Sequence, residues 1–162
     1  MTASLLEEWF PNLAAAGYAV TSPSTLMYNC FAWAAGDNEH SWEPDRVMSN
    51  VYWPTGVERK YTLSNYMQVF ATLGYVACED SKLEDGIEKV ALFTDEDGSP
   101  SHAARQLISG VWTSKLGDAE DIEHNTLEAL EGDVYGTVAQ ILRRPRSDLY
   151  ANTEIRPLIL PM

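Results

Sequence analysis

Cysteine is scarce in this chain, which holds only Cys30 and Cys78 among 162 residues. So sparse a pair does not form the disulfide framework of a small secreted domain. Long apolar runs are also missing, so the sequence predicts no transmembrane helix. The first ten residues are acidic and lack the basic region of a signal peptide, which indicates a cytoplasmic protein. Secretion without a cleaved signal stays open.

Basic residues are few, with 11 Lys and Arg against 24 Asp and Glu, and the formal net charge is −13 at pH 7. Such a surface repels phosphate backbones and anionic lipids, so we expect neither a nucleic-acid partner nor a membrane partner. A strong negative charge keeps a protein soluble, and it also suits binding to a basic protein or a cationic substrate.

Cofactor motifs are absent as well. The chain has no phosphate-binding loop and no dinucleotide fingerprint, and its His and Cys residues are too widely spaced for a zinc signature. Acidic clusters at residues 84–88 and 118–123 lack the alternating oxygens and central Gly of a calcium loop. We interpret both clusters as solvated turns, and the sequence predicts no cofactor and no metal.

The composition suits one globular domain over residues 1–162, because 45% of the residues are hydrophobic and no linker or repeat interrupts them. The first half indicates helices and loops, and the second half indicates strands. This order predicts an α+β fold in which N-terminal helices pack on a C-terminal antiparallel sheet. The patterns indicate helices at 5–13, broken by Pro11, and at 63–73 and 126–131. They also indicate an aromatic-rich loop at 41–56, and strands at 88–94, on both sides of Ser109-Gly110, and at 136–142.

Cys30 is the strongest candidate for chemistry. Asn29 is typical of a helix N-cap, and the apolar residues after Cys30 continue to Gly36, which is typical of a helix end. The thiol would stand in the first turn, where unpaired N–H groups and the helix dipole favour a thiolate. A Cys in such a helix is more commonly an inert core residue, as we expect for Cys78.

The chain offers three histidines as a base for Cys30. His40 lies in a polar loop, and His124 precedes a predicted helix, so surface exposure or capping explains both. His102 opens a predicted strand directly after a turn, a place where a rigid scaffold commonly presents a catalytic group. We therefore predict that His102 is the general base.

The hairpin register decides which residue orients His102. A two-residue turn at Ser109-Gly110 would place Thr113 and Lys115 on the face of His102. A three-residue turn with a left-handed Gly110 would place Ser114 there instead. The Ile-Ser-Gly sequence favours the second form, so Ser114 is the predicted third residue.

The order of Cys, His and a polar residue on the following strand resembles the papain-like superfamily. It is closest to the compact bacterial branch that includes the cysteine, histidine-dependent amidohydrolase/peptidase domains. The chain also resembles an uncharacterised bacterial family that shares its Tyr-Asn-Cys, His-Ala-Ala-Arg-Gln and Trp-Thr-Ser-Lys-Leu-Gly blocks. The matching pieces are residues 28–34 for the nucleophile helix and residues 102–117 for the base hairpin.

The resemblance implies a single papain-like domain in which Cys30 attacks an amide carbonyl and His102 accepts the thiol proton. The oxyanion would be held by the Cys30 backbone N–H and a neighbour, either Tyr28 or Asn29. Ser114 departs from the stronger hydrogen-bonding groups that the superfamily places beside its His.

We therefore expect a cysteine hydrolase that acts on a peptide or other amide substrate as a peptidase, amidase or deamidase. The alternative is an acidic, non-catalytic binding protein of the antitoxin or inhibitor kind. A degenerate papain-like domain kept for interaction alone is a further alternative. The aromatic residues between Trp42 and Trp53 suit core or lid packing better than a substrate platform.

Overall fold

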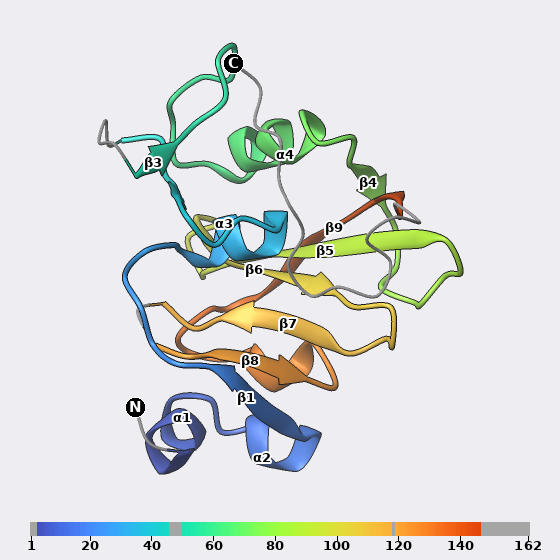
Figure 1. Cartoon of the computed structure of the whole chain (residues 1–162). Helices are drawn as coiled ribbons and strands as arrows, with labels where there is room; N and C mark the ends of the chain where they lie inside the picture. Colours follow the sequence, from blue (N-terminus) through green and yellow to red (C-terminus); the bar gives the residue numbers. More distant parts are fainter. Residues whose placement is uncertain (1–2, 46–49, 118, 147–162) are drawn as a thin grey trace.

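A seven-stranded sheet forms the centre of the molecule in the computed structural model, which describes residues 3–45, 50–117 and 119–146 (Figure 1). All pairs of neighbouring strands are antiparallel. In spatial order the strands are β1 (Tyr18–Ser22), β8 (Asp121–His124), β7 (Trp112–Lys115), β6 (Pro100–Gln106), β5 (Ile87–Thr94), β9 (Thr137–Pro145) and β4 (Val76–Cys78).

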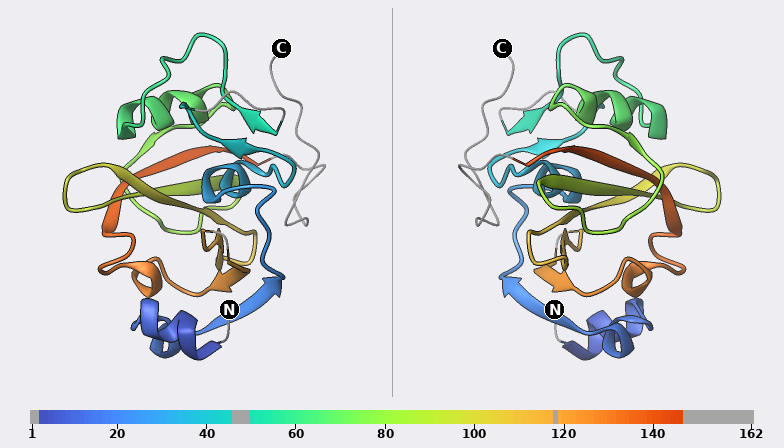
Figure 2. Two further views of the ribbon diagram at one scale, coloured as in Figure 1. Left: turned by 90° about the vertical axis from the view of Figure 1, so that its left-hand side faces the viewer. Right: turned by 90° about the vertical axis from the view of Figure 1, so that its right-hand side faces the viewer.

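The helices are short and lie on both faces of this sheet (Figures 1 and 2). A separate pair of two-residue strands, β2 (Ser41–Trp42) and β3 (Val51–Tyr52), pairs in parallel beside them. None of the helices in the described ranges has the length and apolar character that crossing a membrane requires. They are α1 (Ala3–Trp9), α2 (Leu13–Ala16), α3 (Cys30–Ala35), α4 (Leu63–Ala71) and the 3₁₀-helix η1 (Glu128–Leu130).

Alternation along β5 divides the core into two clusters. Val90 and Leu92 pack with α3 and α4 in the first cluster. Ala91 and Phe93 pack with α1, α2 and η1 in the second. Because successive side chains of a strand point to opposite faces, the two clusters lie on opposite sides of the sheet. The expected combination of helices with an antiparallel sheet is confirmed.

Several sequence predictions of elements were wrong. Residues 41–56 contain the strands β2 and β3 instead of only a loop, and residues 126–131 form one 3₁₀ turn instead of an α-helix. The first half also supplies the two edge strands of the main sheet, β1 and β4. β9 continues to Pro145, beyond its expected end at 142, because its backbone pairs with β5 on one side and β4 on the other.

Helix α3 has only six residues, too few to be stable by its own propensity. The Asn29 side chain caps it as predicted, accepting the Ala32 N–H at 3.0 Å. The same side chain accepts the Trp42 N–H and donates to the Trp42 carbonyl, both at 3.1 Å. Gly36 ends the helix in a left-handed conformation (φ 90°), which a glycine adopts without strain.

Two buried hydrogen bonds connect the α3 region to the sheet. The Trp33 indole donates to the Thr113 hydroxyl on β7 at 2.9 Å. The Tyr28 hydroxyl donates to Asp121 on β8 at 2.5 Å, and the Tyr28 ring stacks on Trp33. These contacts fix the start of α3, and with it Cys30, against β6 and β7.

We predict that Asn29→Ala lowers the free energy of unfolding by about 2–3 kcal/mol, because it removes three hydrogen bonds that each contribute about 1 kcal/mol. Thr62→Ala, at the N-cap of α4, is the matched control and should cost about 1 kcal/mol. Urea unfolding measures both values. Equal losses in the two variants would contradict the role assigned to the Asn29–Trp42 contact.

Candidate functional site

Cys30 begins α3 and is almost wholly buried, with 8% of its surface exposed. Burial raises the pKa of its thiol to about 12. Backbone N–H groups of Ala103, Phe31 and Cys30 itself, and the charge of Lys115, lower that pKa by smaller amounts. The expectation of a thiolate was therefore wrong for the resting molecule, because desolvation outweighs the favourable groups at the helix start. At pH 7 Cys30 is a neutral thiol.

His102 lies on β6 with its ring fully buried. The ring stacks on Tyr135, with 4.1 Å between centroids and 11° between planes, and it meets the edge of Phe93. Its Nε2 lies 3.0 Å from Ser114 Oγ. The prediction that Ser114 shares the face of His102 is confirmed.

The register explains this contact. β6 and β7 pair through Arg105 with Thr113, and the loop closes through the Leu107 N–H and the Val111 carbonyl. Gly110 is left-handed, with φ 97°. The turn is therefore the predicted three-residue form.

The side chains of Thr113 and Lys115, the alternatives to Ser114, lie on the α3 side of the sheet. The Thr113 hydroxyl accepts the Trp33 indole N–H. The Lys115 ammonium donates to the Ala119 carbonyl and lies 5.4 Å from the centre of the Tyr28 ring.

His124 is the residue that sequence reasoning missed. It is fully buried on β8, with Nε2 at 2.7 Å from Ser114 Oγ and Nδ1 at 2.8 Å from the Thr126 carbonyl. Surface exposure or helix capping was the wrong interpretation, because β8 lies between β1 and β7 inside the sheet. The alternate spacing of Ile122 and His124 could have indicated one buried strand face, but the acidic residues on either side of Ile122 concealed it.

The two imidazoles are neutral at pH 7. Burial lowers the pKa of His124 from 6.5 to about 4, and the Thr126 carbonyl opposes this shift only in part. Burial also lowers the pKa of His102 well below 6.5, and the nearby His124 adds to the effect. A neutral imidazole carries one proton, so each ring has one donor nitrogen and one acceptor nitrogen.

The hydrogen-bond chain then assigns every proton. A carbonyl only accepts, so His124 carries its proton on Nδ1 and donates it to Thr126. Its Nε2 accepts the Ser114 hydroxyl, whose oxygen in turn accepts from Nε2–H of His102. His102 Nδ1 is left with a bare lone pair, and this buried atom has no hydrogen-bond partner.

Cys30 and His102 approach the same end of β6 without a hydrogen bond between them among the residues described. Cys30 belongs to the first cluster, whereas the ring of His102 packs against Phe93 and Tyr135 of the second. The sulfur nevertheless faces the N–H of Ala103, the residue that follows His102. The expected direct Cys–His contact is not present in the resting structure.

Strand pairing stops at this position. The ladder between β6 and β7 covers only Arg105 and Gln106 of β6, so it is open toward His102. Tyr135 stacks on His102, and burial raises the pKa of its hydroxyl. The negative charge of Cys30, when that thiol is ionised, raises this pKa by a smaller amount. The open end of the ladder therefore lies beside His102, whose bare imidazole nitrogen is next to the stacked Tyr135 ring, while Cys30 meets β6 from the α3 side at Ala103.

Tyr28 and Asn29, the expected oxyanion donors, use their side-chain donors elsewhere. Tyr28 donates to Asp121, and Asn29 donates to Trp42. The donors beside the sulfur are instead the backbone N–H groups of Ala103, Phe31 and Cys30 itself.

The acidic clusters are not simply solvated turns. Asp121 is buried in β8, and Glu88 is buried in β5, where Arg144 donates to it at 2.9 Å. Residue 118 lies outside the described residues. Within the described ranges, no group of three or more His, Cys, Asp or Glu is placed to hold a metal ion.

Cys78 and His40 lie outside this site. The Cys78 thiol is half-buried at the end of β4 and donates to the Asp80 carbonyl at 3.3 Å. His40 is half-buried beside Asp37, with 2.9 Å between Nδ1 and Oδ2.

We predict opposite tautomers for the two buried histidines at pH 7. His124 should carry its proton on Nδ1 and His102 on Nε2, because the Thr126 carbonyl fixes the direction of the chain. Long-range ¹H–¹⁵N correlation spectra of the imidazole rings measure this directly. A proton on Nδ1 of His102 would contradict the assignment. As a control, Ser114→Ala removes the partner of Nε2, so His102 should lose its preference for the Nε2–H tautomer.

The buried histidines should also make the fold sensitive to acid. The unfolded chain protonates His124 near 6.5 and the folded chain only near 4, so its stabilising effect is complete above pH 6.5 and is lost as the pH falls toward 4. From His124 alone we expect the free energy of unfolding to be about 2 kcal/mol lower at pH 5 than at pH 8. Urea unfolding at both pH values should show this loss reduced in His124→Gln. Ser109→Ala, in the exposed hairpin turn, should keep it, and an unchanged loss in His124→Gln would disprove the assignment.

Comparison with known proteins gives a family but no activity. Curated proteins and solved structures provide no match to this chain. The resemblance to the papain-like superfamily therefore stays a prediction. Residues 19–143 match a family described as a domain of unknown function (DUF7689). Because this match spans well over half of the 162 residues, the chain belongs to the DUF7689 family.

Proposed function

We propose that this protein is a papain-like cysteine hydrolase that cleaves an amide bond, with Cys30 as nucleophile and His102 as general base. The observation that carries the proposal is the bare Nδ1 of His102, buried and without a partner. Buried polar atoms almost always have hydrogen-bond partners, so an exception needs an explanation. A base held ready for a proton explains this one, and the Cys30 sulfur faces the next residue of the strand.

Both groups are neutral at rest, so the proton moves as the sulfur attacks and not before. Cys30 passes its proton to His102 Nδ1 while its sulfur bonds to the amide carbonyl carbon. The imidazolium then gives this proton to the leaving nitrogen as the C–N bond breaks, and a thioester remains. Water attacks the thioester with His102 again as base, which releases the acid and restores the thiol.

Ser114 and His124 act as positioning residues in this mechanism. When His102 becomes an imidazolium, its Nε2–H still donates to the Ser114 oxygen, and Ser114 still donates to His124. The Tyr135 ring holds the imidazole from one face. A hydroxyl carries no full negative charge, so this chain stabilises the imidazolium less than a carboxylate does. We therefore expect modest turnover.

The reaction requires Cys30 Sγ to reach His102 Nδ1, a contact that the resting structure lacks. Catalytic hydrogen bonds are commonly long in free enzymes and tighten when substrate binds. The open ladder between β6 and β7 leaves this end of the two strands without backbone pairing that would resist such a movement.

A non-catalytic function is favoured by a different observation, the burial of Cys30 and its thiol pKa of about 12. In that case the His102–Ser114–His124 chain is a buried network that specifies the core. The net charge of −13 would then serve binding to a basic partner. The reactivity of Cys30 separates the two functions.

We predict that His102 assists alkylation of Cys30 by iodoacetamide. Unassisted alkylation proceeds through the thiolate, so with a pKa of about 12 its rate should rise about tenfold per pH unit between pH 6 and 9. Base assistance by neutral His102 adds a component that is flat over this range. Peptide mass spectrometry at each pH measures the modified fraction of Cys30. His102→Gln should lose the flat component and lower the rate at pH 7 at least tenfold.

Cys78 is the internal control in the same chain, because it lies outside the site and its rate should be unaffected by His102→Gln. Ser114→Ala should weaken the flat component and keep part of it, since it removes the positioning residue and leaves the base. Identical Cys30 profiles in the wild type and His102→Gln would overturn the hydrolase and leave the non-catalytic function.

A further inference from the structure

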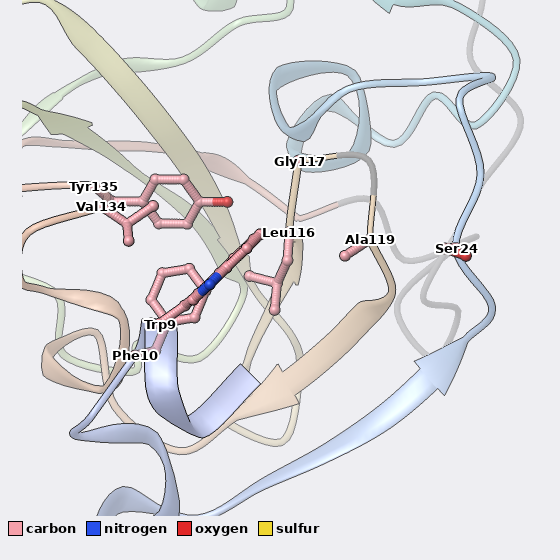
Figure 3. Close-up of a pocket in the computed structure, with 8 residues that line it drawn as sticks. All are labelled: Trp9, Phe10, Ser24, Leu116, Gly117, Ala119, Val134 and Tyr135. Atoms are coloured by element: carbon pink, nitrogen blue, oxygen red, sulfur yellow. The ribbon is translucent and has the colours of Figure 1, made fainter. Parts of the chain in front are cut away.

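An apolar pocket of about 400 Å³ lies beside the ring that stacks on His102 (Figure 3). Ligand pockets in proteins commonly have volumes of about 300–1,000 Å³, so this pocket suits one small group. The residues that line it are Trp9, Phe10, Ser24, Leu116, Gly117, Ala119, Val134 and Tyr135.

The lining determines which chemistry fits. Figure 3 shows the Trp9, Phe10 and Tyr135 rings gathered on one side, near the Leu116 side chain. None of the lining side chains is charged, and only Ser24 and Tyr135 bring a hydroxyl. Such a surface favours an uncharged aliphatic or aromatic group through burial of apolar area.

Tyr135 separates this pocket from the His102 imidazole. One face of its ring stacks on His102 at 4.1 Å, and Gly117, whose backbone slightly lowers the pKa of the Tyr135 hydroxyl, is itself part of the pocket wall. The charge of an ionised Cys30 also raises the pKa of Tyr135, which couples the thiol to the same ring electrostatically. A group seated in the pocket therefore lies one aromatic ring away from the His102 imidazole.

We infer that the pocket receives the side chain of the substrate residue whose carbonyl Cys30 attacks, and that this side chain is of leucine or phenylalanine type. The inference rests on the proposed hydrolase function. An acidic side chain is disfavoured, because no cation lines the pocket among the described residues and the chain carries a net charge of −13.

The first test is the hydrolysis of N-acetyl-aminoacyl coumarinamides that carry Phe, Leu, Ala or Glu. The kcat/KM values for Phe and Leu should exceed those for Ala and Glu at least tenfold, as removing several methylenes from an apolar pocket implies. Ser24→Trp places a large ring at an exposed wall position and should bring Phe and Leu down to the Ala value. Leu26→Trp, at an exposed position outside the lining, is the matched control and should keep the preference.

The second test needs no turnover. N-acetyl-L-phenylalaninamide is titrated into the Cys30→Ala protein, and the indole N–H signal of Trp9 is followed by NMR. A saturable shift that disappears in the Ser24→Trp background supports the pocket, and N-acetyl-L-alaninamide should cause none.

The two tests distinguish a failure of the pocket inference from a failure of the proposed hydrolase function. Binding without hydrolysis of any coumarinamide would support the pocket and count against the hydrolase. Hydrolysis with no preference for Phe or Leu, or no response of Trp9, would overturn the pocket inference and leave the hydrolase standing.

Discussion

The pairing of β6 with β7 through Arg105 and Thr113 is the constraint on which the candidate site depends. Because side chains alternate along a strand, a slip of one residue would exchange the two faces of the hairpin. In the observed register Thr113 meets the Trp33 indole on the α3 side, and Ser114 meets His102 on the other side. The three-residue turn that ends at Gly110 sets this register. One local turn thus positions both the helix that begins at Cys30 and the candidate base.

Desolvation is the second physical effect that governs the site. It keeps His102 and His124 neutral, and it keeps the Cys30 thiol protonated. Neutral rings are also what make the hydrogen-bond chain directional, since each then has one donor and one acceptor. The chain starts at a backbone carbonyl and ends at a bare nitrogen. Burial therefore keeps the thiol protonated and, at the same time, leaves the His102 Nδ1 lone pair without a partner.

Away from this site, a buried cluster of opposite charges holds the strands of the sheet together. The buried Glu88 carboxylate on β5 faces Arg144, Arg146 and Arg105. The Arg144 guanidinium also lies over the Tyr75 ring, 4.5 Å from its centre. Removing the carboxylate would leave buried cations unbalanced, which is costly in a low-dielectric interior. A chain with few basic residues thus gathers three of them where β5, β6 and β9 meet.

Local signals in the sequence determined local features correctly. Asn29 and Thr62 cap their helices, Gly110 sets the hairpin turn, and Ser114 lies beside His102. These features depend on residues close in the chain, where side-chain chemistry and backbone conformation act directly.

Long-range contacts decided the rest. The pairing of β1 with β8 and of β4 with β9 joins distant segments whose own patterns are weak, and it buries His124, which the sequence placed in a polar segment. The packing of α3 against β6 and β7 likewise buries Cys30 and reversed the expected thiolate. Strand partners and desolvation are properties of the assembled fold. The sequence by itself determined which residues are available for chemistry and that Ser114 lies beside His102, whereas the tertiary structure alone decided their protonation and brought His124 to Ser114.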